Sequence, residues 1–302
     1  MLPFARVAIV GLGLIGSSIA RAVRQAMPTV ALTGYDADPE VRATAVRLML
    51  CDDVADSAGA AVTDADLVIL CVPVGAMAAA AGAFAADLPA DAIVSDVGSS
   101  KAEVARALAA ALPGATVIPA HPVAGTERSG PEAGFATLFH KRWCIVTPPA
   151  GADPVAVERV AEFWRRLGAQ VETMAPEHHD RVLAVTSHLP HLIAYTIVGT
   201  ASDLEEVTQG EVIKFSAGGF RDFTRIAASD PTMWRDVFLS NREAVLEMLQ
   251  RFSEDLSHLQ RAIRWGKGDE LFDLFTRTRA IRRSIVEQGQ DDAAADFGRT
   301  HE

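Results

Sequence analysis

A titratable ring stands at the end of an apolar run in the stretch AHPVAGTERSG, residues 120–130. His121 directly follows ATVIPA, whose β-branched residues predict a strand over 115–120, and Pro122 restricts the backbone of the histidine before it. An unperturbed imidazole has a pKa of ~6.5, so it can accept a proton near neutral pH without carrying a charge beforehand. This setting favours a general base that removes a hydroxyl proton as a hydride leaves the same carbon.

A glycine motif, GLGLIG, directly follows the apolar run VAIV and precedes a helical pattern. Gly11 permits a tight turn, Gly13 lets the backbone approach a pyrophosphate, and Gly16 lets the helix pack closely on the strand. The free N–H groups at the start of the helix then attract phosphates. We therefore expect these glycines to bind a dinucleotide, together with Leu14 and Ile15 of the same motif.

An acidic residue, Asp36, ends the second predicted strand in the sequence GYD. A carboxylate at this place can accept hydrogen bonds from the ribose hydroxyls of an adenosine, and it would repel a 2′-phosphate. Residues 35–38 contain no arginine, and Arg42 lies further along in the next predicted helix. The sequence therefore favours NAD as the cofactor over NADP.

Two hydroxyl residues, Ser99 and Ser100, follow the predicted strand 92–97 in the sequence SDVGSSK. Serine is a preferred residue at helix N-termini, so both are expected to cap the next helix. This position is also the carboxyl edge of the sheet, where the nicotinamide lies in folds of this kind. We predict both roles together: a helix cap, and a Ser99 hydroxyl directed into the site.

Histidines gather in the second half of the chain, in the sequences HHD and SHLPHLIAY. His188 and His191 are three residues apart, so they can share one face of a helix. These clusters contain no HExxH and no recognised ligand spacing, so no metal site is predicted. The HHD sequence is instead expected in the first turn of a helix that begins near Pro176, with Asp180 as a favourable charge near its N-terminus.

The segment GGFRDFTRIAASDPTMW, residues 218–234, has the densest mixture of polar and aromatic residues in the second half. Asp222 and Arg225 are three residues apart, so an ion pair on one helical face is the structural interpretation. A guanidinium is also a strong partner for a substrate carboxylate. In a chain of net charge −11, an arginine here favours a locally positive pocket.

Short β-branched runs alternate with helical patterns through the first half of the chain, which predicts an α/β fold with a doubly wound, mostly parallel sheet of the Rossmann type. After about residue 175 only helical patterns remain, so the rest is expected to be all-α. We predict a dinucleotide-binding domain over 1–174 and a helical substrate-binding and dimerisation domain over 175–302. The predicted strands are 6–10, 30–35, 67–72, 92–97, 115–120, 143–148 and 169–174, and the predicted helices include 154–168, 176–204, 232–264 and 268–287.

The composition excludes several classes of partner. The chain has 302 residues, of which 49% are hydrophobic and 22% charged, as in an ordinary globular protein. Its net charge of −11 argues against nucleic acid and against an anionic membrane. The uncharged run 67–86 is interrupted by Pro73 and Gly75, so it is interpreted as a buried strand, a turn and a helix. Three scattered cysteines without a CxxC indicate reduced thiols, and hence a cytoplasmic protein.

These blocks, in this order, resemble the prephenate/arogenate (cyclohexadienyl) dehydrogenase family of tyrosine biosynthesis. The matching sequences are VGLGLIGSSIA, DVGSSK, HPVAGTERSG, HHDRVLAVTSHLPH and GGFRDFTRIAASDPTMW. The resemblance implies an NAD(P)-binding α/β domain followed by a helical domain that forms a homodimer. It also implies oxidative decarboxylation of a small substrate, from prephenate to 4-hydroxyphenylpyruvate, from arogenate to tyrosine, or both.

The same resemblance implies roles for individual residues. His121 is similar to the family's catalytic histidine, and Ser99 to the serine that orients the substrate ring and touches the nicotinamide. Arg225 resembles the arginine that binds the ring carboxylate, and His191 the histidine near the substrate's side chain. Further residues resemble those that shape and gate the pocket: Glu127, Asp222 and Trp234.

Two other functions fit parts of the sequence. A β-hydroxyacid dehydrogenase shares the glycine motif and a helical second half, but its catalytic lysine is expected where the helices begin, and no lysine occurs between Lys141 and Lys214. A non-catalytic NAD-binding regulator is disfavoured because Ser99, His121 and Arg225 occur together. The sequence leaves the choice between prephenate and arogenate open. It favours prephenate slightly, because His191 could hydrogen-bond the keto oxygen of the prephenate side chain.

Overall fold

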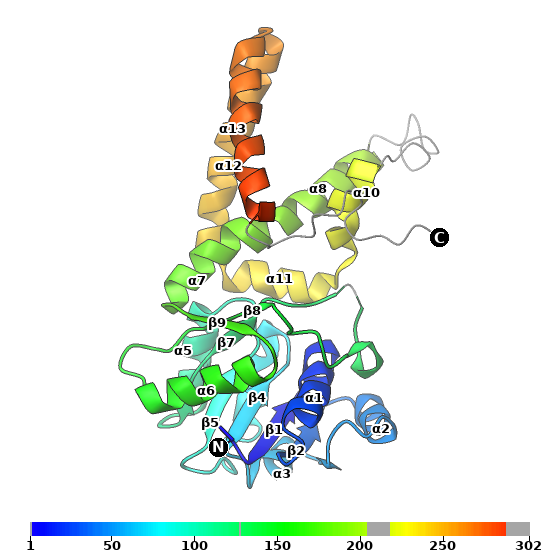
Figure 1. Ribbon diagram of the computed structural model, residues 1–302, viewed down its shortest axis with the longest axis vertical. Coiled ribbons are helices and arrows are strands. Elements are labelled where there is room, and N and C mark those ends of the chain that lie inside the picture. The colour runs from blue at the N-terminus through cyan, green and yellow to red at the C-terminus, as the bar shows by residue number, and fades with distance from the viewer. Residues whose placement is uncertain (1, 127, 204–217, 288–302) are drawn as a thin grey trace. The chain divides into compact units, whose positions relative to one another are not determined.

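A computed structural model describes residues 2–126, 128–203 and 218–287 (Figure 1). The chain divides into two compact units, residues 1–246 and 247–302, which we describe separately. Every site residue discussed below lies in the first unit. The helices from residue 176 to residue 240 belong to the same unit as the sheets, so this division does not fall at the predicted domain boundary, which stays a prediction.

The main sheet has six strands in the order β3-β2-β1-β4-β5-β6, all paired in parallel. The order reverses between β1 and β4, which makes the carboxyl edge at these two strands the expected place for a ligand. The predicted doubly wound parallel sheet is therefore confirmed. Its strands are β1 (Arg6–Val10), β2 (Ala31–Tyr35), β3 (Asp53–Val54), β4 (Leu67–Leu70), β5 (Ile93–Asp96) and β6 (Thr116–Val117).

Both faces of this sheet are buried, because alternate residues of each strand point to opposite sides. Ile9 of β1 joins a core on one face, and its neighbour Val10 joins a second core on the other face. The first core includes residues of α1 (Leu14–Ala26), α2 (Pro39–Arg47) and α6 (Pro154–Arg166). The second includes residues of α3 (Ala58–Val62), α4 (Met77–Gly82) and α5 (Ala102–Ala111).

A second, three-stranded sheet carries the histidine of the AHP sequence. It has the order β7 (Ala120–Pro122), β8 (Trp143–Val146) and β9 (Gln170–Thr173), and β7 runs antiparallel to β8. The prediction of one strand over 115–120 was wrong, since β6 ends at Val117 and β7 belongs to the other sheet. Proline has no N–H, so Pro119 cannot extend the ladder of the parallel sheet, and its carbonyl accepts the Thr147 amide instead.

One long helical segment follows the sheets. It consists of α7 (Pro176–Leu183), a π-helical turn (η3, Ala184–His188) and α8 (Leu189–Asp203). By length and composition the segment 176–203 could cross a membrane, and 28% of its most apolar window is buried in the protein. The later elements are α10 (Gly218–Thr224), the 3₁₀ turn η5 (Arg225–Ala228), α11 (Pro231–Ser240), α12 (Arg242–Arg264) and α13 (Gly268–Glu287).

One difference from the sequence prediction, and one feature that agrees with it, matter for the site. The helical pattern over 232–264 is broken at Asn241, whose φ of −104° and ψ of 33° separate α11 from α12. The break turns the side chain of Asn241 inward, where it is 5% exposed. Between β4 and α4 a 3₁₀ turn, η1 (Val74–Ala76), packs against α11, so the uncharged run 67–86 forms a strand, a turn and a helix as predicted.

Candidate active site

The glycine motif forms a cradle between β1 and α1. Gly11 has a φ of +101°, and a side chain there would approach the Cys71 carbonyl oxygen to 2.5 Å. A Cβ at Gly16 would lie 1.9 Å from the Gly11 carbonyl oxygen, so only glycine lets α1 start this close to the strand. At Gly13 no atom lies within 4 Å of the missing Cβ. The backbone of Gly13, at the N-cap of α1, is thus open to a phosphate group.

Asp36 lies beside this cradle at the end of β2. Its Oδ2 accepts a hydrogen bond from the Leu12 amide at 2.8 Å, and its Oδ1 accepts one from the Asp38 amide at 3.0 Å. Each oxygen keeps a lone pair for a ribose hydroxyl. Arg42 lies nearer than its sequence position suggested, since its Nη1 donates to the Asp36 carbonyl oxygen at 2.7 Å. The residues present fit a dinucleotide with a free ribose 2′-hydroxyl.

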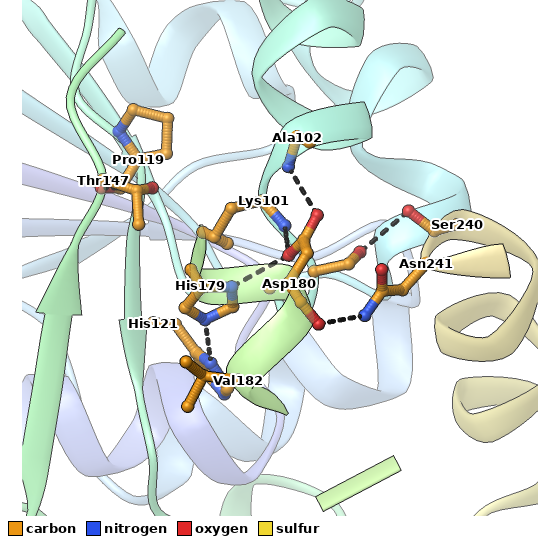
Figure 2. Close-up of polar contacts among 12 residues, drawn as sticks. Lys101, Ala102, Pro119, His121, Thr147, His179, Asp180, Val182, Ser240 and Asn241 are labelled. Atoms are coloured by element: carbon orange, nitrogen blue, oxygen red, sulfur yellow. Dashed lines mark hydrogen bonds and ion pairs between the residues drawn. The ribbon is translucent and has the colours of Figure 1, made fainter. Parts of the chain in front are cut away.

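A row of three buried side chains begins at His121 (Figure 2). The Nδ1 atom of His121 lies 2.8 Å from Nε2 of His179, and Nδ1 of His179 lies 2.8 Å from Oδ1 of Asp180. His179 is fully buried and His121 is 7% exposed. His121 comes from β7, whereas the other two come from α7, so the row joins the second sheet to the first helix of the helical segment.

The hydrogen bonds in this row determine which ring nitrogens carry protons. Asp180 also accepts the backbone amides of Lys101 at 2.7 Å and Ala102 at 2.9 Å, so it acts as an ionised acceptor. His179 must then donate from Nδ1, which leaves its Nε2 as an acceptor in the neutral ring. His121 must therefore donate from Nδ1. Its Nε2 keeps a lone pair, which is the atom that a general base needs.

The electrostatic surroundings keep both rings neutral at neutral pH. Burial lowers the pKa of His121 well below its usual range, and the charges that His179, Lys101 and His188 can carry lower it further. Burial also lowers the pKa of His179, although its hydrogen bond to Asp180 opposes this. Burial alone would raise the pKa of Asp180, but hydrogen bonds from His179 and the two amides hold it below its usual range.

A fully buried ion pair supports the backbone under His121. Lys101 contacts Asp96, at the end of β5, and both side chains are 0% exposed. The Lys101 Nζ also donates to the Ala120 carbonyl oxygen at 2.8 Å, and the Gly98 amide donates to Asp96 at 2.7 Å. Burial raises the pKa of Asp96 and lowers that of Lys101, and their contact opposes both shifts. The pair joins the carboxyl end of β5 to the residue before His121.

The predicted serine cap of α5 is not what the structure contains. The N-cap residue is Lys101, without a side-chain cap, and the carboxylate of Asp180 accepts the first amides instead. Asp180 therefore acts at the N-terminus of α5 rather than at that of its own helix. Ser100 does not cap the helix. Its Oγ lies 2.8 Å from the Oγ of Ser240 instead. Ser99 precedes it and is partly exposed.

Two of the residues predicted to bind substrate, His191 and Trp234, contact each other. His191 stacks on Trp234 with ring centroids 3.6 Å apart, and the nearby charge of Arg225 lowers the pKa of His191 after the larger effect of burial. His188 contacts the same indole edge to face at 6.0 Å. Arg225 starts the turn η5 and is exposed, and Asp222 in α10 is partly buried. Glu127 lies outside the described residues.

Sequence reasoning missed His179, Asp180 and Lys101 as members of the site. The sequence pattern places HHD in the first turn of a helix, and only contacts across the fold bring it to His121. One signal was available for Lys101, which directly follows the two serines of SDVGSSK at the sheet's carboxyl edge. Among the residues that the structure describes, no group of three or more His, Cys, Asp or Glu side chains could hold a metal ion.

A glycine cradle on a parallel sheet, with a neutral buried histidine at a nearby strand, defines a dinucleotide-dependent dehydrogenase as the class of protein. Comparison with known families identifies the particular one. Residues 19–173 match the family model described as prephenate dehydrogenase, nucleotide-binding domain, and residues 175–277 match prephenate dehydrogenase, dimerization domain. The chain therefore belongs to the prephenate dehydrogenase family and is an NAD-dependent oxidoreductase.

Relatives and solved structures agree with this assignment. The cyclohexadienyl dehydrogenase of Zymomonas mobilis is 45% identical over 94% of this chain and 97% of its own, and the prephenate dehydrogenase of Bacillus subtilis is 33% identical over 92% and 75%. A crystal structure of Aquifex aeolicus prephenate dehydrogenase with hydroxyphenyl propionate and NAD⁺ is 35% identical, with a TM-score of 0.87 over 94% of this chain and 98% of that one. A 3-hydroxyisobutyrate dehydrogenase at 15% identity and a TM-score of 0.53 shares the fold alone.

Proposed function

We propose that this enzyme catalyses the NAD-dependent oxidative decarboxylation of prephenate, of arogenate, or of both, with His121 as the general base. The observation that carries the proposal is the hydrogen-bonded row His121–His179–Asp180, which leaves the Nε2 lone pair of His121 unused. Family membership supplies the substrate class. NAD supplies a hydride acceptor when it is bound in the glycine cradle.

The proposed role of His121 is to move one proton. As the ring carbon that bears the hydroxyl loses its hydride, Nε2 of His121 takes the hydroxyl proton and the carbon becomes a ketone. The ring carboxylate then leaves as carbon dioxide, and its electron pair makes the ring aromatic. The phenolate that results takes the proton back from His121. While the imidazole is charged, the carboxylate of Asp180 stabilises it through His179.

We assign substrate binding to the stacked pair His191 and Trp234 together with Arg225. Arg225 is the proposed partner of the ring carboxylate, because a guanidinium gives two parallel hydrogen bonds to a carboxylate. Its charge next to His191 supports a locally positive pocket in a chain of net charge −11. His191 is assigned to the substrate's side chain, Ser99 to the ring and the nicotinamide, and Asp222, Glu127 and Trp234 to the shape of the pocket.

The remaining assignments concern the whole protein. We propose a homodimer through the helical part of the chain, in line with the family's dimerization domain, which matches residues 175–277. The apolar segment 176–203 would then be covered by protein rather than by lipid. We also propose that residues 1–174 bind NAD, that residues 175–302 bind substrate and dimerise, and that the enzyme works in the cytoplasm.

An absorbance assay of cofactor reduction tests the proposed reaction. The purified enzyme is given prephenate or arogenate, each with NAD and with NADP. We expect turnover with NAD and at least one of the two substrates, and lower kcat/KM with NADP, since Asp36 would repel its 2′-phosphate. The absence of turnover in all four combinations would reject the function.

The general base is tested by His121→Asn, with the exposed His178→Asn on α7 as the matched control. Loss of a general base lowers kcat by roughly 10²–10⁴-fold. We expect this loss for the first variant and an unchanged kcat for the second. A His121→Asn enzyme with nearly full kcat would remove His121 from the mechanism.

A further inference from the structure

His188 is fully buried beside the site, and no role was assigned to it above. It ends the π-helical turn η3 between α7 and α8. At about 100° per residue, a regular α-helix would put residue 188 roughly 80° away from residue 180 around the axis. The extra residue in a π turn rotates the residues after it back by about 100° around the axis. Residues 180 and 188 then lie roughly 20° apart. The π turn thus brings His188 to the same side of the helix as Asp180.

Asn241, at the break between α11 and α12, joins these two residues. Its Nδ2 donates to the backbone carbonyl oxygen of Asp180 at 2.8 Å and lies 3.1 Å from Nδ1 of His188. A carbonyl oxygen can only accept, so the contacting atom of Asn241 must be its amide nitrogen. Nδ1 of His188 must then be an acceptor, and the proton of the neutral ring is on Nε2. Burial lowers the pKa of His188 to about 4, so the ring is neutral at pH 7.

The Nε2–H of His188 is therefore a donor in a fixed direction. It is buried and has no well-formed hydrogen bond among the residues that the structure describes. The charge of Asp180 and, to a smaller extent, the neighbouring backbone of Ser99 oppose the effect of burial on the pKa of this ring. The next residue, Ser100, contacts Ser240 at 2.8 Å, immediately before Asn241. The loop that carries Ser99 and Ser100 therefore lies next to His188 and to Ser240, the residue before Asn241.

We propose that His188 is a positioning residue: its Nε2–H holds the backbone carbonyl of Ser99, and so directs the Ser99 hydroxyl toward the reacting ring and the nicotinamide. Asn241 fixes the tautomer that makes this possible. The inference rests on the role proposed for Ser99. It gives a function to the π turn, because a regular helix would rotate the imidazole away from the loop.

A double-mutant cycle in kcat tests the proposal. His188→Leu removes the donor, and a misplaced reacting group costs roughly 10- to 100-fold in kcat. Ser99→Ala removes the group on which His188 acts. If His188 works through Ser99, the double variant has about the kcat of Ser99→Ala alone. His178→Leu is the matched control, since this exposed histidine on the same helical segment lies outside the site.

Rescue by a conservative variant separates positioning from packing. The amide nitrogen of glutamine can reach the place of a histidine Nε2, so His188→Gln should regain part of the lost kcat while His188→Leu does not. Multiplicative losses in the double-mutant cycle, or equal kcat for the Gln and Leu variants, would overturn the proposal. Neither outcome touches the proposed function, which fails only if the wild-type enzyme has no turnover with either substrate.

The tautomer can be measured in the wild-type protein, independently of any variant that does not fold. With ¹⁵N-labelled histidine, NMR distinguishes a protonated ring nitrogen from an unprotonated one. We expect His188 to carry its proton on Nε2 and to keep Nδ1 unprotonated at pH 7. A proton on Nδ1 would contradict the contact with Asn241 and remove the basis of the proposal.

Discussion

At the scale of single residues, the site combines groups whose charges depend on one another. Burial and the charge that His179 can carry lower the pKa of His121 most, and the charge of Lys101, which pairs with Asp96, lowers it further. Asp180 has the opposite effect on His179, whose pKa it raises against the effect of burial. A base in this setting takes a proton only briefly, and the proton returns when the product ring needs it. This suits a reaction in which His121 ends in its starting state.

The proposed carboxylate partner, Arg225, leads to a prediction about substrate affinity. Replacing Arg225 with alanine should raise KM for prephenate far more than it lowers kcat, because the ring carboxylate is bound in the ground state as well as in the transition state. Hydrogen bonds to charged groups contribute about 1.5–3 kcal/mol, which corresponds to roughly a 10- to 100-fold rise in KM. Steady-state kinetics measure it, with Arg221→Ala on the neighbouring turn as the control. An unchanged KM in Arg225→Ala would reject the assignment.

At the scale of elements, Asp180 is the point where the helical segment meets the sheet domain. One carboxylate accepts two amides at the start of α5 and orients a histidine on its own helix, α7. The same first turn of α5 follows the loop that carries Ser99. The position of α7 therefore sets both the base and the loop opposite it. A change in either helix can therefore reach the reacting groups through Asp180.

Asp180→Asn tests this double role. The amide can accept one of the two α5 amides, but its NH₂ group would face another donor, so we expect a loss of about 1 kcal/mol in the free energy of unfolding. The neutral side chain also stabilises the charged His121 less through His179, which should lower kcat. Asp153→Asn is the control, because Asp153 caps α6 at 3.0 Å from Val155 and touches no site residue. Urea unfolding measures the stability of each variant, and steady-state kinetics measure its kcat. An Asp180→Asn enzyme with full kcat would contradict the proposed role of Asp180 in stabilising His121 through His179.

How far the sequence predicts each element depends on how local its cause is. The glycine cradle and the strands β1 and β2 follow from patterns within a few residues, and they were predicted almost to the residue. The split between β6 and β7 has a local cause, Pro119, that the apolar run concealed. The contact of His121 with His179 joins positions 58 residues apart, and no local pattern encodes it. The π turn that re-aims His188 also has no signature in the residue types of η3.

At the scale of the whole molecule, the buried histidines predict how stability changes with pH. His121, His179 and His188 all have a pKa lowered by burial. Above pH ~6.5 these rings are neutral in both the folded and the unfolded chain. Below pH ~6.5 these histidines are protonated in the unfolded chain but stay neutral in the folded chain. The free energy of unfolding therefore falls by about 1.4 kcal/mol per pH unit for each histidine. For His188 the loss continues down to a pKa of about 4.

Urea unfolding at pH 7.5 and pH 5 measures this dependence. His188→Gln should reduce the slope by about one proton, since glutamine does not titrate. The carboxylates of Asp52, Asp66 and Asp180, whose pKa values are lowered, act at a lower pH because their unfolded-state pKa is ~3.9. Equal stability at the two pH values would mean that the histidines are solvated rather than buried.

The apolar side chains of the helical part predict its assembly. On α13, Phe272 is 70% exposed and Phe275 is 56% exposed, and they are three residues apart on one helical face. Two such rings in water favour a partner surface, and both lie within residues 175–277, which match the family's dimerization domain. The double variant Phe272→Asp and Phe275→Asp should therefore sediment as a monomer, while the wild-type protein sediments at twice the chain mass. Thr276→Asp, on the same exposed turn, adds one negative charge, against two in the double variant, without removing an aromatic ring, and should stay dimeric. A double variant that remains dimeric would exclude Phe272 and Phe275 from the dimer interface. The interface would then be sought among other exposed apolar residues, such as Ile197 and Val198 on α8.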